Sequence, residues 1–254
     1  MAWNPSQYLA FAGPRMQPAI DLLNRIPQET PGSVIDLGCG PGNITPLLRQ
    51  RWQDADIIGL DNSDTMLERA RTACPDETFD HCDITAWQPD RQYDVIFSNA
   101  ALQWVTGHDT LFPHLLDPVA PGGTLAIQIP RNTDAPSHRL IGDVIEGGPW
   151  RDLLAPIRDA IPTQEPAWYR NLLSTTAQSL DIWETEYMQV LDGDNPVAEY
   201  TKGSQLTRFL EPLDEAARGE FESRYRDLVI KAYPPESDGK TLFPFLRLFI
   251  LANA

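Results

Sequence analysis

Short apolar runs alternate with longer amphipathic stretches over the first half of the chain, and this alternation predicts strands separated by helices. Pro121-Gly122-Gly123 is expected to form the turn before the fifth strand, which Pro130 ends. This order predicts an α/β fold built on a doubly wound parallel sheet. The expected helices cover 14–26, 43–52, 63–73 and 108–117, and the expected strands cover 33–38, 56–60, 78–82, 93–98 and 124–129.

Prolines and glycines break this pattern after Pro130, where short helical pieces replace the regular alternation. A loosely patterned region of this kind suits a lid or substrate cap better than more sheet. Further strands are expected at 181–191 and 243–251, with helical pieces over 195–232 between them. Within those pieces, apolar residues around Phe221 and Tyr225 recur at helical spacing, and we expect them to form core rather than a contact surface.

The most informative segment is 33–43, where an apolar strand runs into a loop with glycines at positions 38, 40 and 42. Glycines let this backbone turn sharply and leave no side chain between the chain and a bound ligand. The spacing is G-x-G-x-G, whereas dinucleotide folds that bind a pyrophosphate use G-x-G-x-x-G. Asp36 stands two residues before the first glycine. An acid there suits a cationic ligand without phosphates, such as S-adenosylmethionine, whose ammonium group would face Asp36.

Two more acids end the next two expected strands. Asp61 comes 25 residues after Asp36, at a position where a ribose diol needs a bidentate acceptor. Asp83 could accept from the adenine amino group. Three consecutive strands that end in this way place their terminal residues along one carboxyl edge of an open parallel sheet. Plainer roles stay open, because Asp61 could cap the following helix and Asp83 could be a turn residue before Thr85.

The composition narrows the range of partners. A formal net charge of −16 over 254 residues disfavours a nucleic-acid backbone or an anionic membrane surface as the partner. A small anionic substrate is compatible with that charge only if a few arginines form a local positive pocket. The three cysteines lack C-x-x-C spacing, so neither a disulfide framework nor a zinc site is expected, and a reducing cytoplasm is the natural compartment.

The histidines and the apolar runs exclude two further classes. The four histidines form no ligand pattern, since His108 and His114 are six residues apart rather than four, so we expect no metal. No charged-then-apolar leader follows Met1, and no apolar run approaches 18 residues, so neither secretion nor membrane spanning is indicated.

The chain resembles the class I S-adenosylmethionine-dependent methyltransferases over residues 31–130. Over nearly its whole length it is similar to the trans-aconitate 2-methyltransferase family. This resemblance implies a Rossmann-like seven-stranded sheet in the order 3-2-1-4-5-7-6, with the last strand antiparallel and with helical cap insertions. Residues 142–170 follow the family pattern poorly. The closer similarity rests on the segments Trp3–Tyr8, Asp36–Asn43, Ser98–Trp104, Leu111–Leu115, Asp181–Trp183 and Arg247–Ile250.

The resemblance also implies the reaction and the domain organisation. A methyl group passes from S-adenosylmethionine, leaving S-adenosylhomocysteine, to a carboxylate of a small polycarboxylic acid, with trans-aconitate as the first candidate. A single domain is expected over 1–254, with an N-terminal helical gate at 1–30 and the cofactor-binding core at 31–130. The cap is expected at 131–180 and 192–240, and the last strands at 181–191 and 242–252. A monomer or a homodimer is expected.

The predicted cofactor ligands combine the glycine loop, the strand-end acids and the segment after the fourth strand. Trp3 and Tyr8 would fold over the cofactor, and Asn99 would help to hold the ammonium group. For the aromatic residues, ordinary core packing is an equally simple role. The complete predicted set is Trp3, Tyr8, Asp36, Gly38, Cys39, Gly40, Asn43, Asp61, Asn62, Met66, Asp83, Ile84, Asn99, Ala100 and Trp104.

No catalytic side chain is expected, because a carboxylate with a pKa near 4 is already ionised at pH 7 and needs no general base. The enzyme must instead align the reacting atoms and exclude water. Forked donors are needed to hold the acceptor. Arg247 stands out in an otherwise apolar strand, where a structural ion pair or a surface position is the alternative. The predicted substrate-binding residues are Arg15, Gln103, His138, Tyr169, Arg208 and Arg247.

Three other functions are alternatives to this interpretation. A methyltransferase of the same fold could act on another free carboxyl, such as a malonyl group on a carrier protein, although the acidic chain lacks an evident basic docking patch. The domain could also bind S-adenosylmethionine without catalysis. A nicotinamide-dependent oxidoreductase is disfavoured, because the third glycine has the wrong spacing for a pyrophosphate.

Overall fold

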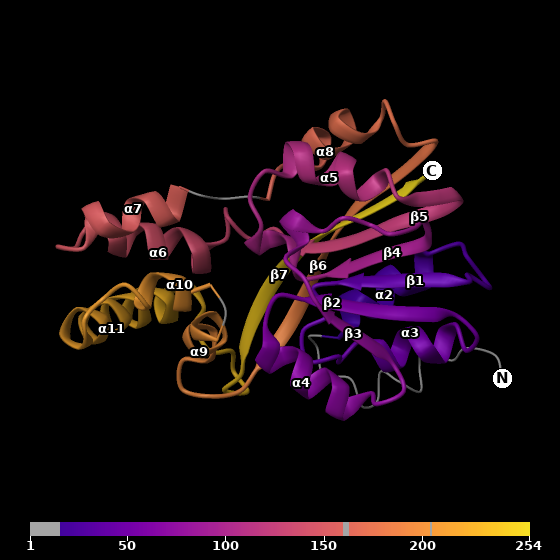
Figure 1. Ribbon diagram of the computed structural model, residues 1–254. Helices are drawn as coiled ribbons and strands as arrows, with labels where there is room; N and C mark the ends of the chain where they lie inside the picture. Colours follow the sequence, from indigo (N-terminus) through magenta and orange to yellow (C-terminus); the bar gives the residue numbers. More distant parts are fainter. Residues whose placement is uncertain (1–15, 160–162, 204) are drawn as a thin grey trace. The chain divides into compact units, whose positions relative to one another are not determined.

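The apolar runs form one seven-stranded sheet (Figure 1). The computed structural model describes residues 16–159, 163–203 and 205–254. The strand order β3-β2-β1-β4-β5-β7-β6 confirms the predicted order. β1 pairs in parallel with β2 and β4, and β7 is antiparallel to β5, as expected. The strands are β1 Ser33–Leu37, β2 Asp56–Asp61, β3 Thr78–His81, β4 Tyr93–Asn99, β5 Val119–Pro130, β6 Ser179–Leu191 and β7 Thr241–Asn253.

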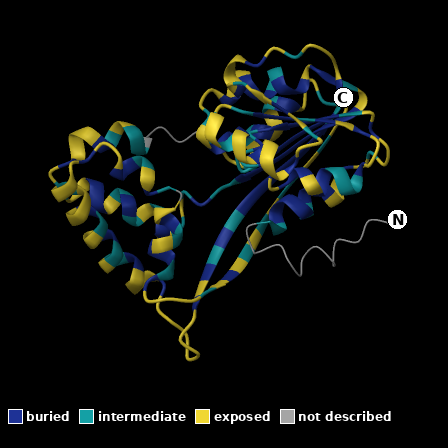
Figure 2. Ribbon diagram, turned by 60° about the horizontal axis from the view of Figure 1, so that its bottom comes forward, coloured by how far each residue is buried: buried dark blue, intermediate teal, exposed yellow. Residues whose placement is uncertain are grey.

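Helices cover both faces of the sheet formed by β1 to β5. Figure 1 shows α2 (Gln17–Arg25), α3 (Thr45–Arg51) and α4 (Asp64–Ala73) on one face. The other face carries α5 (His108–Leu116) and α8 (Pro166–Leu173), whose apolar side chains join Ile35, Ile96 and Ile127 of the strands in one core. Figure 2 shows the central strands as almost continuously buried. This explains why the strands read as apolar runs, since a parallel sheet covered on both faces has no solvent-facing side.

The chain divides into two compact units. The first contains residues 1–130, 162–184 and 247–254, and the second contains 131–161 and 185–246. A separate apolar core holds the second unit together, and Phe221 and Tyr225 are fully buried in it, which confirms their predicted core role. Its helices are α6 (Pro136–Glu146), α7 (Arg151–Asp159), α9 (Pro196–Lys202), α10 (Thr207–Leu210) and α11 (Glu215–Ala232).

The start of β5 differs from the prediction. The segment Pro121-Gly122-Gly123 was expected as a turn, but β5 already begins at Val119 and includes it. Gly122 has φ +79°, and the register with β4 shifts between Tyr93 and Val95. A Cβ on Gly123 would lie 2.7 Å from the carbonyl oxygen of Asp94. The glycines therefore let an irregular strand stay paired closely with β4, where the sequence suggests a break.

Candidate active site

The glycine loop after β1 uses its three glycines in different ways. All three have positive φ values: +76° for Gly38, +56° for Gly40 and +78° for Gly42. A Cβ on Gly38 would lie 2.3 Å from Cβ of Ala101, and one on Gly42 would lie 3.2 Å from Cα of Ala70. Only Gly40 has no atom within 4 Å of that position. Gly38 and Gly42 therefore allow close packing against the chain itself, whereas the space beside Gly40 is open.

Asp36 is a buried carboxylate at the end of β1. Its side chain is 2% exposed, and its Oδ2 atom has no hydrogen-bond partner among the described residues. Burial, and then the negative charge of Asp61, raise the pKa of Asp36 to about 7. A nearby cation would stabilise the ionised form of this buried carboxylate. The ammonium group that the sequence assigns to this position would supply one.

Asp61 is the last residue of β2, and its two oxygens hold two loops. Oδ2 accepts from the backbone N–H of Gly40 at 2.9 Å, and Oδ1 accepts from that of Ser63 at 2.9 Å. The helix α4 is capped by Ser63, whose hydroxyl accepts from the N–H of Met66. Asp61 therefore does not cap the helix. It fixes the glycine loop beside the start of α4, and each of its oxygens keeps a second lone pair for a hydroxyl donor.

Asp83 follows β3 and begins a short 3-10 turn, Ile84–Ala86. Its Oδ1 atom accepts from both the N–H and the hydroxyl of Thr85, each at 2.8 Å. These two bonds lower the pKa of Asp83. Asp83 is therefore a turn residue, as the alternative interpretation of the sequence proposed. This role is compatible with binding a ligand, because both bonds end on Oδ1 and leave Oδ2 able to accept from another donor.

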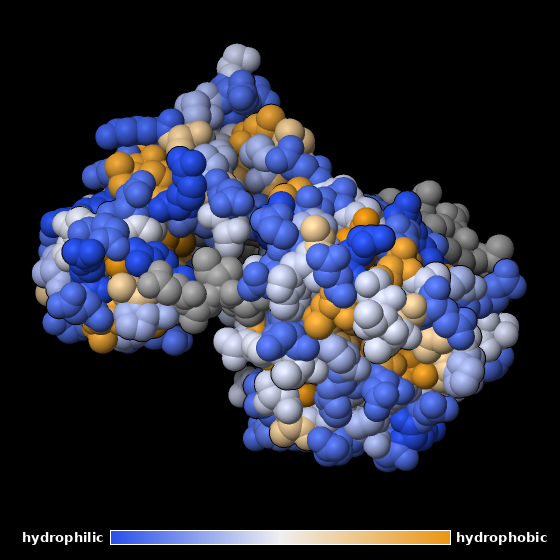
Figure 3. Space-filling view, turned by 90° about the horizontal axis from the view of Figure 1, so that it is seen from above, coloured by the Kyte–Doolittle hydropathy of each residue, from blue (hydrophilic) through white to orange (hydrophobic). Residues whose placement is uncertain are grey.

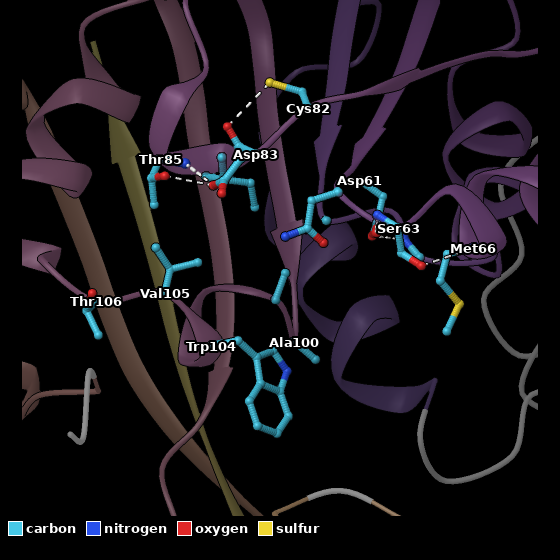
Figure 4. A pocket seen from close by; sticks show the side chains of 15 residues that line it. Asp61, Ser63, Met66, Cys82, Asp83, Thr85, Ala100, Trp104, Val105 and Thr106 are labelled. Carbon is cyan, nitrogen blue, oxygen red and sulfur yellow. Dashed lines mark hydrogen bonds between the residues drawn. The ribbon is translucent and has the colours of Figure 1, made fainter. Parts of the chain in front are cut away.

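These segments surround a cavity of about 600 Å³ (Figure 4). Residues from the ends of β1 to β4 line it, including the predicted ligands Gly38, Gly40, Asp61, Asn62, Met66, Asp83, Ile84, Ala100 and Trp104. In Figure 4, Asp61 and Asp83 come from separate segments, and the indole of Trp104 extends away from both. Asp36, Cys39, Asn43 and Asn99 do not line this cavity. The sequence did not single out Ser63, Cys82, Thr85, Ala101, Val105 and Thr106, which also line it.

The end of β4 and the loop after it contain a strained residue and two buried amide oxygens without partners. Ala100 has φ +54°, an unfavourable conformation for a residue with a Cβ. The N–H of Ala100 donates to the carbonyl of Gln128, and its carbonyl accepts from Nε2 of Gln103 at 2.6 Å. Within the described part of the chain, the buried atoms Asn99 Oδ1 and Gln103 Oε1 have no hydrogen-bond partner. Strain of this kind gathers at ligand sites, and these oxygens would suit a donor.

The predicted acceptor ligands are spread over both units. Arg247 lies in the first unit on β7 and is 7% exposed, so it is not at the surface. In the second unit, the Arg208 guanidinium donates to the carbonyl of Ile157 and lies over the ring of Phe209. The ring of His138, also in that unit, lies 3.1 Å from the hydroxyl of Ser137, and desolvation lowers its pKa to about 4. At pH 7 this imidazole is neutral.

Tyr169 is fully buried in the core of the first unit. Its hydroxyl lies 2.6 Å from Nδ1 of His108, whose Nε2 lies 2.9 Å from the carbonyl of Leu102. Since a carbonyl only accepts, Nε2 carries the proton, and Nδ1 accepts from the tyrosine hydroxyl. That hydroxyl also accepts from the N–H of Gln164. These contacts give Tyr169 a structural role beneath the 102–105 segment.

Three predicted ligands, Trp3, Tyr8 and Arg15, lie outside the described residues. Among the described residues, no group of three histidine, cysteine or acidic side chains is arranged to hold a metal ion. The described helices include none with the length and apolar character needed to cross a bilayer. Polar and charged residues cover most of the face in Figure 3, and the apolar ones form separate patches.

The residues present fit S-adenosylmethionine. An uncompensated buried carboxylate, Asp36, and the buried amide oxygen of Asn99 suit a cationic donor. Residues 34–123 match a family described as a methyltransferase domain. The fold also resembles phosphoethanolamine N-methyltransferase 2 of Haemonchus contortus, a structure in complex with S-adenosyl-L-methionine. That match has a TM-score of 0.57 and 17% identity, and it covers 93% of this chain and 52% of the other. The protein is a class I S-adenosylmethionine-dependent methyltransferase.

Relatives of similar sequence over nearly the whole chain show to which family it belongs. The chain is 45% identical to trans-aconitate 2-methyltransferase of Azoarcus sp. (strain BH72) over 250 residues, which are 98% of each chain. It is 46% identical to trans-aconitate 2-methyltransferase of Streptomyces coelicolor over 264 residues, covering 99% of this chain and 86% of the relative. The chain belongs to the trans-aconitate 2-methyltransferase family.

Proposed function

We propose that this methyltransferase converts a small polycarboxylic acid into its monomethyl ester, with trans-aconitate as the first candidate acceptor. The names of its near-full-length relatives support this acceptor. The structural observation that carries the proposal is the buried guanidinium of Arg247, which lies on the same sheet as the cofactor acids. A buried cation at this edge suits an anionic acceptor, because a guanidinium binds a carboxylate through two parallel hydrogen bonds.

In this proposal the strand ends hold the cofactor. Asp36 and Asn99 receive the ammonium group, Asp61 receives the ribose hydroxyls and Asp83 receives the adenine amino group. The remaining predicted contacts come from Gly38, Cys39, Gly40, Asn43, Asn62, Met66, Ile84, Ala100 and Trp104. When bound, S-adenosylmethionine supplies an electrophilic methyl group.

The protein's contribution to the reaction is alignment and desolvation. The acceptor carboxylate is ionised at pH 7, so no side chain has to remove a proton. The strained Ala100 backbone and the close packing of Gly38 on Ala101 fix the segment after β4 beside the glycine loop. The Trp104 side chain, 51% exposed where it lines the cavity, is able to shield the reacting groups from water. Trp3 and Tyr8 remain predicted parts of this cover.

Arg247 is the foremost acceptor ligand in the proposal. Arg15, Gln103, His138, Tyr169 and Arg208 remain predictions with weaker support. The Tyr169 hydroxyl is already engaged by His108, and one end of the Gln103 amide is engaged by Ala100. His138 is neutral at pH 7, so it can offer an acceptor carboxylate a hydrogen bond but no charge.

The test is production of S-adenosylhomocysteine with each acid offered separately, with the product mass read alongside. Trans-aconitate, cis-aconitate, isocitrate, citrate, itaconate and a malonyl-carrier protein form the panel. The proposal expects turnover on trans-aconitate with a gain of one methyl group. Turnover on the malonyl carrier alone would show that the acceptor is the carrier-bound malonyl group and not trans-aconitate. Cofactor binding without turnover on any acid would indicate a module that binds S-adenosylmethionine without catalysis.

A cytoplasmic location, a monomeric or homodimeric state and the absence of a nucleic-acid partner are also part of the proposal. The three free cysteines support a reducing compartment, and the net charge of −16 supports the last point. Sedimentation analysis would give the oligomeric state.

A further inference from the structure

Four polar side chains form a row across the sheet. In the strand registers, Asp36 of β1 is opposite Phe97 of β4, two residues before Asn99, and Asn99 is opposite Gln128 of β5. On the next strand, Pro130 is opposite Arg247 of β7. Because side chains alternate along a strand, Asp36, Asn99, Gln128 and Arg247 share one face of the sheet. The row begins with an anion, continues with two amides and ends with a cation.

Gln128 is the least compensated member of this row. It is 0% exposed, and neither its Nε2 nor its Oε1 atom has a hydrogen-bond partner within the described part of the chain. Phe249 stands opposite it on β7, with Trp183 stacked on that ring at 4.7 Å. An amide without partners beside aromatic rings destabilises the protein, whereas leucine would fill a similar volume without that penalty. The position therefore fits a ligand that provides the missing hydrogen bonds.

The place of Gln128 in the sheet indicates which ligand this is. The cofactor cavity is lined from the ends of β1, β2, β3 and β4, and β5 contributes nothing to it. Gln128 lies one strand beyond Asn99, on the side of Arg247. Diagonal neighbours on antiparallel strands are about 7–8 Å apart, so long side chains at positions 128 and 247 can reach a common group. A guanidinium and an amide N–H₂ around one group form a binding site for a carboxylate.

We propose that Gln128 is a specificity-determining residue that binds a carboxylate of the acceptor other than the one that is methylated. Nε2 of Gln128 donates to one oxygen of that carboxylate, and Arg247 pairs with the same group. This inference rests on the proposed polycarboxylate function and adds a second recognition point to it. Acids that lack the extra carboxylate lose this contact, so the residue selects for acids with several carboxylates.

The variant Gln128→Leu separates this role from a structural one. We expect the KM for trans-aconitate to rise by about 10- to 100-fold, which is the cost of losing a hydrogen bond to a charged group. The dissociation constant of S-adenosylhomocysteine, measured by calorimetry, should stay within about twofold. The melting temperature of the ligand-free protein should stay equal or rise, because an unpaired buried amide is removed.

Gln128→Glu gives a second, charged variant of the same size. A carboxylate at this position would pair with Arg247 and repel the acceptor, so its KM should rise more than in Gln128→Leu. The matched control is Thr124→Val, four residues earlier on β5. Thr124 is also fully buried, but its hydroxyl donates to Asn253 at 2.6 Å. Its loss should lower the melting temperature by about 2–4 °C and leave the KM unchanged.

The acceptor panel tells apart a failure of this inference and a failure of the proposed function. The wild-type preference for trans-aconitate over the dicarboxylate itaconate, as a ratio of kcat/KM values, should fall about tenfold or more in Gln128→Leu. If the wild type methylates trans-aconitate but Gln128→Leu keeps both its KM and this ratio, the inference is wrong and the function stands. If the wild type methylates no polycarboxylate, the proposed function fails first. A lower melting temperature in Gln128→Leu with an unchanged KM would assign the residue to packing alone.

Discussion

The two halves of the sheet edge in the first unit differ in charge. The half formed by β1, β2 and β3 ends in Asp36, Asp61 and Asp83, whereas the half formed by β5 and β7 presents Gln128 and Arg247. The first half suits a cation with hydroxyl and amino donors, and the second suits an anion. One sheet can therefore hold two oppositely charged ligands side by side, in an acidic protein whose overall field would repel an anionic acceptor.

Removing an acid from the first half has the largest expected effect. Asp61→Ala should raise the dissociation constant of S-adenosylmethionine by about 100-fold or more. The variant loses the proposed hydrogen bonds to the ribose hydroxyls, and it also loses the carboxylate that holds the backbone of Gly40 and Ser63. Calorimetry measures the dissociation constant. Asp64→Ala is the matched control, since this acid lies three residues later and its side chain is 83% exposed. An equal loss in both variants would show that only the general negative charge matters.

Removing the cation from the second half should act on the other ligand. Arg247→Ala should raise the KM for the acceptor by about 30-fold, which corresponds to one buried charge-assisted contact, and should leave cofactor affinity nearly unchanged. Arg25→Ala is the control, because this arginine lies over Trp183 in a solvent-exposed ion pair with Asp181. Weaker cofactor binding in Arg247→Ala would contradict the assignment of the cofactor and the acceptor to different halves of the sheet edge.

The pKa of Asp36 makes cofactor binding depend on pH. With that pKa at about 7, the acid is mostly protonated at pH 6 and mostly ionised at pH 8. Since the ammonium group requires the ionised form, affinity for S-adenosylmethionine should rise about tenfold between these pH values, and binding at pH 7 should release about half a proton per site. Calorimetry in two buffers with different ionisation enthalpies measures the proton. Asp36→Asn should abolish both effects.

The raised pKa of Asp36 also predicts that the stability of the ligand-free protein falls as the pH rises, whereas cofactor affinity increases. The folded pKa of Asp36 lies above its unfolded value of 3.8, so the folded state binds more protons between about pH 4 and pH 7. The contribution of Asp36 to stability is therefore greatest below pH 4 and falls as the pH rises to 7. If Asp36→Asn showed the same fall as the wild type, another group would be responsible.

The smallest expected effect is at Asp83. Thr85→Val removes one of the two hydrogen bonds to its Oδ1 atom and keeps the backbone N–H bond. Because Asp83 is exposed, cofactor affinity should fall by only about two- to threefold. A fluorescence titration with S-adenosylmethionine measures this change. A loss as large as that in Asp61→Ala would mean that the adenine end, rather than the ribose, dominates binding.

Much of the first half of the edge could be predicted from the sequence, because its signals are local. Gly38, Asp61 and Asp83 each lie at or just after the end of a short strand, and parallel strands bring their ends together. What each glycine does could not be predicted. The close approach of Gly38 to Ala101 and of Gly42 to Ala70 depends on segments far away in the chain.

The second half of the edge could be predicted only in part, although Gln128 and Arg247 carry the same sequence signal. The sequence indicates Arg247 as an isolated charge in an apolar strand, whereas Gln128, an isolated amide between Ile127 and Ile129, is not among the predicted site residues. Its missing hydrogen bonds and its place beside Asn99 follow from strand register, which requires the sheet order. Likewise, the burial of Tyr169 against His108 depends on α8 packing on α5, and this contact joins residues 61 positions apart.

The most direct test of this division is a crystal structure of the protein with S-adenosylhomocysteine and trans-aconitate bound together. We expect the ribose hydroxyls on Asp61, the ammonium group near Asp36, and an acceptor carboxylate within hydrogen-bond distance of Gln128 and Arg247. A structure in which Gln128 and Arg247 contact no acceptor carboxylate, or in which the acceptor lies against the acids of the first half, would contradict this expectation.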